Sequence, residues 1–323
     1  MSQKIILPSS LEGKTILIAG AAGFVPSNVA EFYLKLGATV IGVDNFITGS
    51  QSNVDKLSKY PNYQFHEMDV AKKLPKCDNL DYVLSLASPA SPIDFKTIPL
   101  EIMEVNSRGT WNLLELTKEK HARFLEASTS EVYGDPEIHP QVEEYVGCVN
   151  PIGPRSCYDE SKRFAEALTM SYFRRHNVDT RIVRIFNTYG PGMRPNDGRI
   201  IPNFINQAMN NEDVTIYGDG LQTRSYCYVT DLVNAIHNVL FSNIHTPFNI
   251  GNPDEYNVLE TAKLIIDVLG SKSKLSFFPL PEDDPKKRRP NINKLQSISD
   301  YKPLVNFKDG IVKTAEYFKT LTK

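Results

Sequence analysis

Cysteine is scarce in this chain. Only four of its 323 residues are cysteines, and no two of them stand in a C-x-x-C spacing. Disulfide-stapled folds and zinc sites need clustered or regularly spaced cysteines, so the sequence predicts neither a disulfide framework nor a metal site. We expect reduced thiols and a cytoplasmic location. The cysteines are Cys77, Cys148, Cys157 and Cys227.

Long apolar runs and an excess of one charge are also missing. No apolar stretch approaches the about 18 residues that a membrane span needs, and the opening MSQKIILPSS does not resemble a secretory signal. There are 36 Lys and Arg against 38 Asp and Glu, a net charge of -2. A protein that binds nucleic acid or a membrane through bulk positive charge is therefore excluded, whereas a local basic site for one phosphorylated ligand is compatible with this composition.

Short β-branched runs alternate with longer helical stretches in the first part of the chain. Residues 15–19, 38–43, 82–86, 123–127 and 180–185 predict strands, and residues 27–36, 101–120 and 158–176 predict helices. Continuously apolar strands separated by helices are typical of a parallel sheet covered on both faces. The expected fold class is therefore α/β, a Rossmann-type doubly wound parallel sheet.

The pattern changes after about residue 188. Gly and Pro become frequent, strands become short, and helices are expected at 231–241 and 258–269, followed by the basic segment DDPKKRRP. We expect a dinucleotide-binding domain at 1–188 and a smaller α/β substrate lobe at 189–323, with a strand and a helix exchanged between the two.

A glycine turn, GAAGFVP at 20–26, lies between the first strand and the first helix. Such a turn lets backbone N–H groups and the helix N-terminus face a pyrophosphate. Asp44 ends the second strand, where a carboxylate would hold the ribose hydroxyls of NAD and repel the 2′-phosphate of NADP. Pro26 stands where a third glycine is usual, and it suits the first turn of a helix.

Two further segments predict acid–base chemistry. Tyr158 and Lys162 lie one helical turn apart, and a nearby ammonium would favour the phenolate that can remove a proton from a hydroxyl. A surface Tyr–Lys pair is common, so this spacing alone is weak evidence. The segment ASTSEVYG strengthens it, because Thr129, Ser130 and Glu131 follow an apolar strand and so belong at the ligand-binding edge of the sheet.

These segments, together with several others, resemble the extended short-chain dehydrogenase/reductase superfamily, and within it most closely the UDP-glucuronate decarboxylases (UDP-xylose synthases). The shared text includes LASPASP, STSEVYGDPEIHPQ, NPIGPRSCYDESKR, RIFNTYGP, NDGRIIPNF, YGDGLQTRSYCYVTDLV and DDPKKRRPNI. Sugar-nucleotide 4,6-dehydratases read T-D-E where this chain reads Thr129-Ser130-Glu131. Serine is no general acid at neutral pH, which favours decarboxylation over dehydration.

The resemblance implies the role of each site residue. The expected catalytic residues are Thr129, Ser130, Glu131, Tyr158, Lys162 and Arg288. The NAD site would comprise Gly20, Gly23, Phe24, Val25, Asp44, Asn45, Asp69, Val70, Leu86, Ala87, Ser88 and Asn106, with Tyr158 and Lys162. The UDP-sugar would contact Pro89, Ser91, Asn187, Arg199, Asn203, Tyr217, Gln222 and Arg224. A homodimer through the helices at 101–120 and 158–176 is expected from the superfamily.

Two departures from the family pattern keep alternatives open. Ser50 replaces an arginine of the family's T-G-R loop, and residues 146–151 read VGCVNP where the family has W-G-H-V-N-P. The substrate is expected to be UDP-glucuronate, with UDP-N-acetylglucosaminuronate as an alternative. A UDP-sugar 4-epimerase and an inactive NAD-binding scaffold are further alternatives, although an intact set of Thr129, Tyr158 and Lys162 argues against the scaffold.

Overall fold

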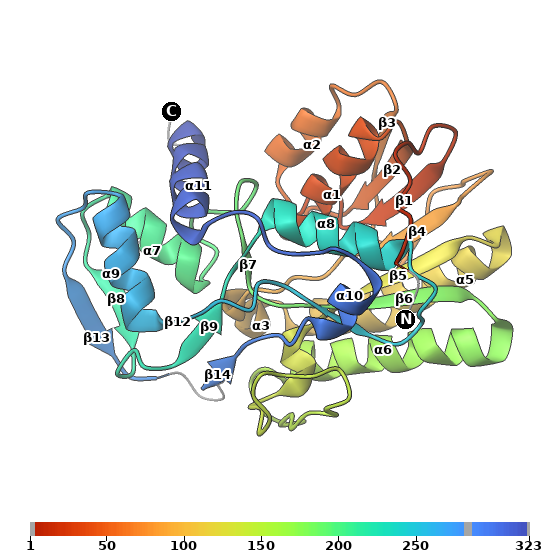
Figure 1. The fold of residues 1–323 in the computed structure, drawn as a ribbon. Helices are drawn as coiled ribbons and strands as arrows, with labels where there is room; N and C mark the ends of the chain where they lie inside the picture. The colour runs from red at the N-terminus through yellow and green to blue at the C-terminus, as the bar shows by residue number, and fades with distance from the viewer. Residues whose placement is uncertain (1–3, 281–285, 322–323) are drawn as a thin grey trace.

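A seven-stranded parallel sheet forms the centre of the molecule in the computed structural model, which describes residues 4–280 and 286–321 (Figure 1). The strand order is β11-β6-β5-β4-β1-β2-β3. The predicted α/β doubly wound fold is thereby confirmed. The order reverses between β1 and β4, and in such sheets ligands bind outside the carboxyl ends of the strands at this point. The strands are β1 Thr15–Ala19, β2 Thr39–Asp44, β3 Tyr63–Glu67, β4 Tyr82–Ser85, β5 Arg123–Thr129, β6 Asp179–Ile185 and β11 Phe248–Ile250.

Helices cover both faces of this sheet because its strands are apolar on both sides. Alternate residues of β1 show this: Ile16 and Ile18 belong to one buried cluster, with residues of α1 and α8, whereas Leu17 and Ala19 belong to a second, with residues of α5 and α6. No helix among the described residues has the length and apolar character that crossing a membrane requires. The helices of this part are α1 Phe24–Lys35, α2 Gln51–Leu57, α3 Pro92–Thr97, α4 Pro99–Glu104, α5 Thr110–Lys120, α6 Ser156–His176 and α8 Val229–Leu240.

The predicted single helix at 101–120 was wrong in one respect. A π-helical turn, Val105–Gly109, separates α4 from α5. At Gly109 a side-chain Cβ would lie 3.1 Å from a methyl group of Val70, so the backbone here passes close to the segment after β3. Asn106 on the same turn donates a hydrogen bond to Ser161 of α6 at 2.9 Å. The π-helical turn thus lies between α6 and the segment after β3, two neighbours that are distant in the sequence and that the local residue pattern does not reveal.

The second lobe packs beside the carboxyl edge of the sheet (Figure 1). Its small sheets pair β12-β9-β14, β13-β8 and β10-β7. The segment after residue 188 also contributes β11 and α8 to the central sheet and its covering layer. The remaining elements are β7 Thr188–Tyr189, α7 Ile200–Met209, β8 Val214–Tyr217, β9 Thr223–Ser225, β10 Cys227–Tyr228, β12 Glu255–Asn257, α9 Val258–Val268, β13 Leu275–Phe278, β14 Lys287–Arg288, α10 Asn293–Ile298 and α11 Phe307–Leu321. Asp283, Asp284 and Pro285 of the basic segment lie outside the described residues.

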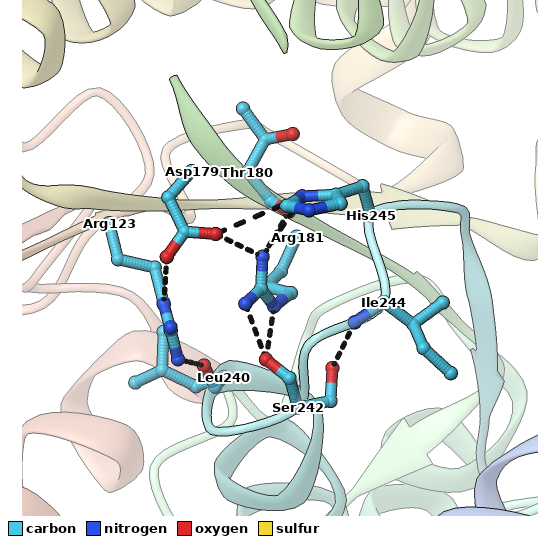
Figure 2. Close-up of polar contacts among 8 residues, drawn as sticks. All are labelled: Arg123, Asp179, Thr180, Arg181, Leu240, Ser242, Ile244 and His245. Carbon is cyan, nitrogen blue, oxygen red and sulfur yellow. Dashed lines mark hydrogen bonds and ion pairs between the residues drawn. The ribbon is translucent and has the colours of Figure 1, made fainter. Parts of the chain in front are cut away.

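A buried arginine joins α8 to the sheet at the edge opposite the ligand crevice (Figure 2). Arg181 of β6 is 1% exposed, and its Nε donates to the carbonyl of Ser242 at 2.7 Å, just after α8. Its Nη1 donates to Asp179 at 2.6 Å, and Asp179 also accepts from Arg123 at 2.7 Å. Arg123 in turn donates to the carbonyl of Leu240, the last residue of α8. The end of α8 therefore has its free carbonyls satisfied by side chains of β5 and β6.

Replacing Arg181 should destabilise the fold without touching the ligand crevice. We expect Arg181→Met to lower the free energy of unfolding by about 3 kcal/mol, because buried carbonyls and Asp179 lose their donor. The midpoint of urea unfolding at an unchanged m-value measures this. Arg175→Met, at an exposed position in the last turn of α6, is the control and should stay within about 0.5 kcal/mol of the parent. Equal midpoints for the two variants would contradict the assignment.

Candidate active site

A cavity of about 930 Å³ opens at the carboxyl edge of the sheet, between the two lobes. Its walls include the ends of β1, β2, β4 and β5 and parts of the second lobe. The sequence-predicted residues that line it are Gly20, Gly23, Phe24, Val25, Asp44, Asn45, Asp69, Val70, Leu86, Ala87, Ser88, Pro89, Ser91, Thr129, Ser130, Glu131, Tyr158, Lys162, Asn187, Arg199, Asn203, Tyr217, Gln222 and Arg224. Residues separated by up to about two hundred positions in the chain therefore meet at one crevice.

The glycine turn after β1 forms one wall of this cavity. Gly20 has φ of 81°, and a Cβ at this position would lie 2.7 Å from the backbone of Ala87. Only glycine fits there, because both the backbone angle and the space exclude a side chain. Gly23 caps α1, and Pro26 is buried in the first turn of that helix. The missing N–H of Pro26 is one that a helix N-terminus leaves without an internal partner, so proline is accommodated.

Asp44 lies at the end of β2, next to this turn. Its carboxylate accepts hydrogen bonds from the backbone N–H of Ala22 at 3.0 Å and of Phe46 at 2.7 Å. Burial raises the pKa of Asp44, and these N–H groups oppose the rise. The backbone thus fixes the carboxylate at the cavity wall. A turn without side chains, a helix N-terminus and a fixed carboxylate are the features that a dinucleotide requires, so these residues fit NAD.

Tyr158 and Lys162 of α6 face the end of β5. The Tyr158 ring is stacked on Phe95, with the ring centroids 5.0 Å apart. Burial raises the pKa of Tyr158, and a hydrogen bond with Thr129 lowers it. The ammonium of Lys162 donates to the carbonyl of Ala127 at 2.7 Å and lies 3.2 Å from Glu126. A phenol held against a threonine, with an ammonium one turn further along the helix, is an acid–base arrangement.

Charged groups converge next to the phenol. Glu131 lies 2.5 Å from the Arg155 guanidinium and 3.2 Å from that of Arg288. Burial alone would raise the pKa of Glu131, but the positive charges of Arg288 and Arg155 outweigh it and hold that pKa well below its usual range. Burial and the charge of Glu131 raise the pKa of Asp159. Arg224 stands opposite Arg288 in the β9–β14 pairing, and the charges of Arg155, Arg224 and Arg288 all act on Glu131.

Two predicted residues do not line the cavity. Arg288 is 2% exposed and lies behind Glu131, where it also donates to the carbonyl of Ser130. Asn106 is buried under α6, against Ser161. Two others line it but have partners within the protein: Ser91 donates to the carbonyl of Asp197, and Arg199 pairs with the Asp197 carboxylate.

The structure also adds residues that the sequence predictions missed. Phe95 stacks on Tyr158, and Arg155 binds Glu131 and lies over the Phe95 ring at 5.4 Å. Glu126 contacts Lys162. A sequence signal existed for Glu126, since a carboxylate inside the apolar run 123–127 is unusual for a strand that is buried on both faces.

Comparison with known proteins agrees with this geometry. The model of the NAD dependent epimerase/dehydratase family matches residues 16–257. UDP-glucuronic acid decarboxylase 1 of Danio rerio is 46% identical over 310 residues, 96% of this chain and 74% of that protein. UDP-glucuronic acid decarboxylase 2 of Arabidopsis thaliana is 46% identical over 308 residues, 95% of this chain and 69% of that protein.

Among solved structures, UDP-glucuronic acid 4-epimerase from Bacillus cereus, in complex with UDP-glucuronic acid and NAD, superposes with a TM-score of 0.84. It is 27% identical and covers 95% of this chain and 99% of the epimerase chain. The glycine turn, the Tyr–Lys pair, the family match over most of the chain and the strong similarity to the decarboxylases lead to one conclusion. The chain belongs to the NAD-dependent epimerase/dehydratase family, within which it is a UDP-glucuronate decarboxylase-like enzyme.

Proposed function

We propose that this enzyme converts UDP-glucuronate to UDP-xylose and carbon dioxide, with NAD bound throughout. The observation that carries the proposal is the position of the Thr129–Tyr158 pair beside the arginine cluster around Glu131. A sugar placed between them would present its 4-hydroxyl to the phenol and its carboxylate to the guanidinium groups. The similarity to UDP-glucuronic acid decarboxylases supports the same substrate.

Tyr158 would act on the 4-hydroxyl of the sugar. The glycine turn and Asp44 would hold NAD, which would supply the acceptor for the hydride from C4 and its source when the ketone is reduced again. As the hydride leaves, the Tyr158 phenolate takes the hydroxyl proton, while Thr129 donates a hydrogen bond to the same oxygen. The charge of Lys162 favours the phenolate. Because the tyrosine is buried and its pKa is raised, this support is required for proton removal near neutral pH.

After this oxidation, the C6 carboxylate of the sugar would leave as carbon dioxide. The new 4-ketone is β to the carboxylate, so the C5–C6 bond breaks with its electron pair entering the ketone as an enolate and carbon dioxide departing. A proton then adds to C5, and the returning hydride and the Tyr158 proton restore the 4-hydroxyl. If strong ion pairs held the sugar carboxylate, they would stabilise the substrate more than the transition state for loss of carbon dioxide, and the reaction would slow. Arg155, which lines the cavity, is already paired with Glu131, and this pairing would moderate its hold on the substrate carboxylate.

The second lobe would hold the nucleotide. Arg199 and Arg224 line the cavity, and a planar guanidinium binds a pyrophosphate through paired hydrogen bonds. Tyr217, Gln222, Asn203 and Asn187 line the same region and supply polar and aromatic contacts to a uridine and its ribose. We place the reaction in the cytoplasm, a proposal that the four free cysteines support.

Carbon dioxide release distinguishes the proposed reaction from its alternatives. UDP-glucuronate labelled at C6 and incubated with the enzyme and NAD should lose the label as carbon dioxide and yield UDP-xylose, identified by mass spectrometry. A 4-epimerase would keep the label and form UDP-galacturonate, which would contradict the proposal. UDP-N-acetylglucosaminuronate assayed in parallel identifies the preferred uronate, and faster turnover of it would correct the substrate assignment.

Removing the Tyr158 hydroxyl should abolish most of the activity. We expect Tyr158→Phe to lower kcat by about 10² to 10⁴-fold, because the base is lost while the ring still stacks on Phe95. Tyr172→Phe is the matched control: this tyrosine lies on the same helix, and its hydroxyl binds Glu115 instead of the cavity. Steady-state rates of UDP-xylose formation compare the two. An unchanged rate in Tyr158→Phe would show that Tyr158 is not the catalytic base, whereas absence of turnover in the parent protein would favour the scaffold alternative.

Asp44 should determine the choice between NAD and NADP. Asp44→Ser removes the negative charge that faces a 2′-phosphate, so we expect the preference for NAD over NADP to fall about tenfold or more. Asp55→Asn is the control, since Asp55 lies on α2 with its side chain bonded to Gln51. Titration calorimetry with each cofactor gives both affinities. Equal cofactor preference in Asp44→Ser and in the parent would show that Asp44 has no such role.

We propose further that the enzyme is a homodimer through α4, α5 and α6. Large apolar side chains are exposed on these neighbouring helices: Leu100 at 75%, Met103 at 46%, Trp111 at 49% and Phe164 at 44%. An exposed apolar surface of this kind is typical of a protein interface.

The double variant Trp111→Lys, Phe164→Lys should therefore be monomeric in light scattering. Leu304→Lys, at a position 70% exposed outside these helices, should keep the dimer mass. A monomeric parent protein, or a double variant with the dimer mass, would refute this interface.

A further inference from the structure

Glu126 is a carboxylate in the interior of the central sheet. It lies in β5 with 0% of its surface exposed, paired in register with Ser85 of β4 on one side and Ile182 of β6 on the other. One carboxylate oxygen, Oε1, lies 3.2 Å from the Lys162 ammonium. The other, Oε2, is buried and has no hydrogen-bond partner among the described residues. The side chain therefore has one ion pair, with Lys162, beside the neighbouring Ser85.

Stability does not explain a carboxylate at this position. Lys162 is itself only 3% exposed, so two charges are held away from water. Replacing a buried ion pair by apolar side chains of similar volume is often neutral or stabilising, because the pair must be desolvated to form. An apolar residue would also match Phe124, which lies two residues earlier on the same face of β5 and is buried in an apolar cluster. The contact with Lys162 is thus the feature that sets Glu126 apart from an ordinary core residue.

The neighbours of this pair show which charges act on it. Burial raises the pKa of Glu126, the Lys162 ammonium and Ser85 lower it, and the charge of Glu166 on α6 raises it. Glu166 is held by Arg184 at 2.8 Å, so it is not a partner of Lys162. Around the nearby phenol of Tyr158, the charged groups are Glu131, Arg199 and Asp159. Within the part of the chain that the structure describes, Glu126 is the carboxylate that contacts the Lys162 ammonium.

The proposed role of Lys162 sets two requirements for its ammonium group. First, its positive charge must favour the phenolate of Tyr158, one turn away on α6. The negative charge of Glu126 partly cancels this effect, because it lies next to the ammonium. Its ammonium must also stay at a fixed place, which Glu126 and the Ala127 carbonyl provide by holding it against the end of β5. A fixed carboxylate behind the lysine therefore controls both where the ammonium lies and how strongly its field reaches the phenol.

We propose that Glu126 is a positioning residue for Lys162, which holds the ammonium against β5 and partly neutralises it, and so sets the pH range in which Tyr158 acts as a base. The inference rests on the proposed decarboxylation. Glu126 does not itself line the cavity, whereas Lys162 does, so the effect of Glu126 on the reaction passes through Lys162.

The pH profile of kcat/KM tests this role. In Glu126→Gln the carboxylate charge is removed at constant shape, and the field of Lys162 at Tyr158 is no longer countered. The acidic limb of the profile, where the base gains its proton, should move to lower pH by about one unit. Glu126→Leu removes the hydrogen bond as well and should shift the limb in the same direction. It also provides a well-packed variant if the glutamine is poorly tolerated in the core.

Glu166→Gln is the matched control. It removes a nearby, largely covered carboxylate that pairs with Arg184 instead of Lys162, so its acidic limb should stay close to that of the parent. A purely structural role of Glu126 would lower stability and kcat without moving the limb. An unshifted limb in both Glu126 variants, a shift to higher pH, or an equal shift in Glu166→Gln would overturn the proposal.

A second measurement separates this inference from the proposed function. The ultraviolet absorbance of the Tyr158 phenolate is obtained as the difference between each NAD-bound protein and its Tyr158→Phe counterpart, titrated with pH. Its midpoint should be lower in Glu126→Gln than in the parent, whatever substrate the enzyme uses. If the midpoint shifts but no UDP-xylose forms, only the proposed substrate is refuted. If UDP-xylose forms but the midpoint does not shift, only the role of Glu126 is refuted.

Discussion

The ion pairs of Glu131 with Arg155 and Arg288 connect three segments that are far apart in the chain. Glu131 follows β5, Arg155 precedes α6 and Arg288 lies in β14 of the second lobe. A buried carboxylate is stable only when it is paired, and each guanidinium satisfies part of it. The position of the second lobe against the end of β5, and with it the shape of the cavity, therefore depends on this pairing. The same charges define where a uronate carboxylate would lie.

The central sheet is stabilised independently of that site. Arg181 and Arg123 join the end of α8 to β5 and β6 at the opposite edge, where no cavity residue lies. Two charged clusters thus lie at the two ends of neighbouring strands, one that supports the fold and one that belongs to the chemistry. This separation places the charged groups of the cavity apart from those that hold α8 on the sheet.

Membership of the NAD-dependent epimerase/dehydratase family is consistent with the glycine turn and the Tyr–Lys pair, and the structure shows how further residues support them. Pro26 fits in the first turn of α1 because the N–H that proline lacks would have no hydrogen-bond partner within the helix at that position. Phe95 holds the face of the Tyr158 ring, which limits the directions in which its hydroxyl can point. Glu126 places a second charge behind Lys162. These contacts adjust a common mechanism through the surroundings of its reacting groups.

The sequence by itself determined the α/β class, the glycine turn, the acid at the end of β2 and the spacing of Tyr158 and Lys162. Each of these depends on interactions within a strand, a turn or one helical turn, and such short-range preferences are written directly in the residue order. Sequence reasoning failed where contacts are long-range. It predicted one helix over residues 101–120. The π-helical turn around Asn106 was missed because its contacts are with α6 and with the segment near Val70, both distant in the sequence. It also did not reveal that Arg155 pairs with Glu131 or that Glu126 lies under Lys162. Only the packing of α6 against β5 and the turn that follows it brought those charges together.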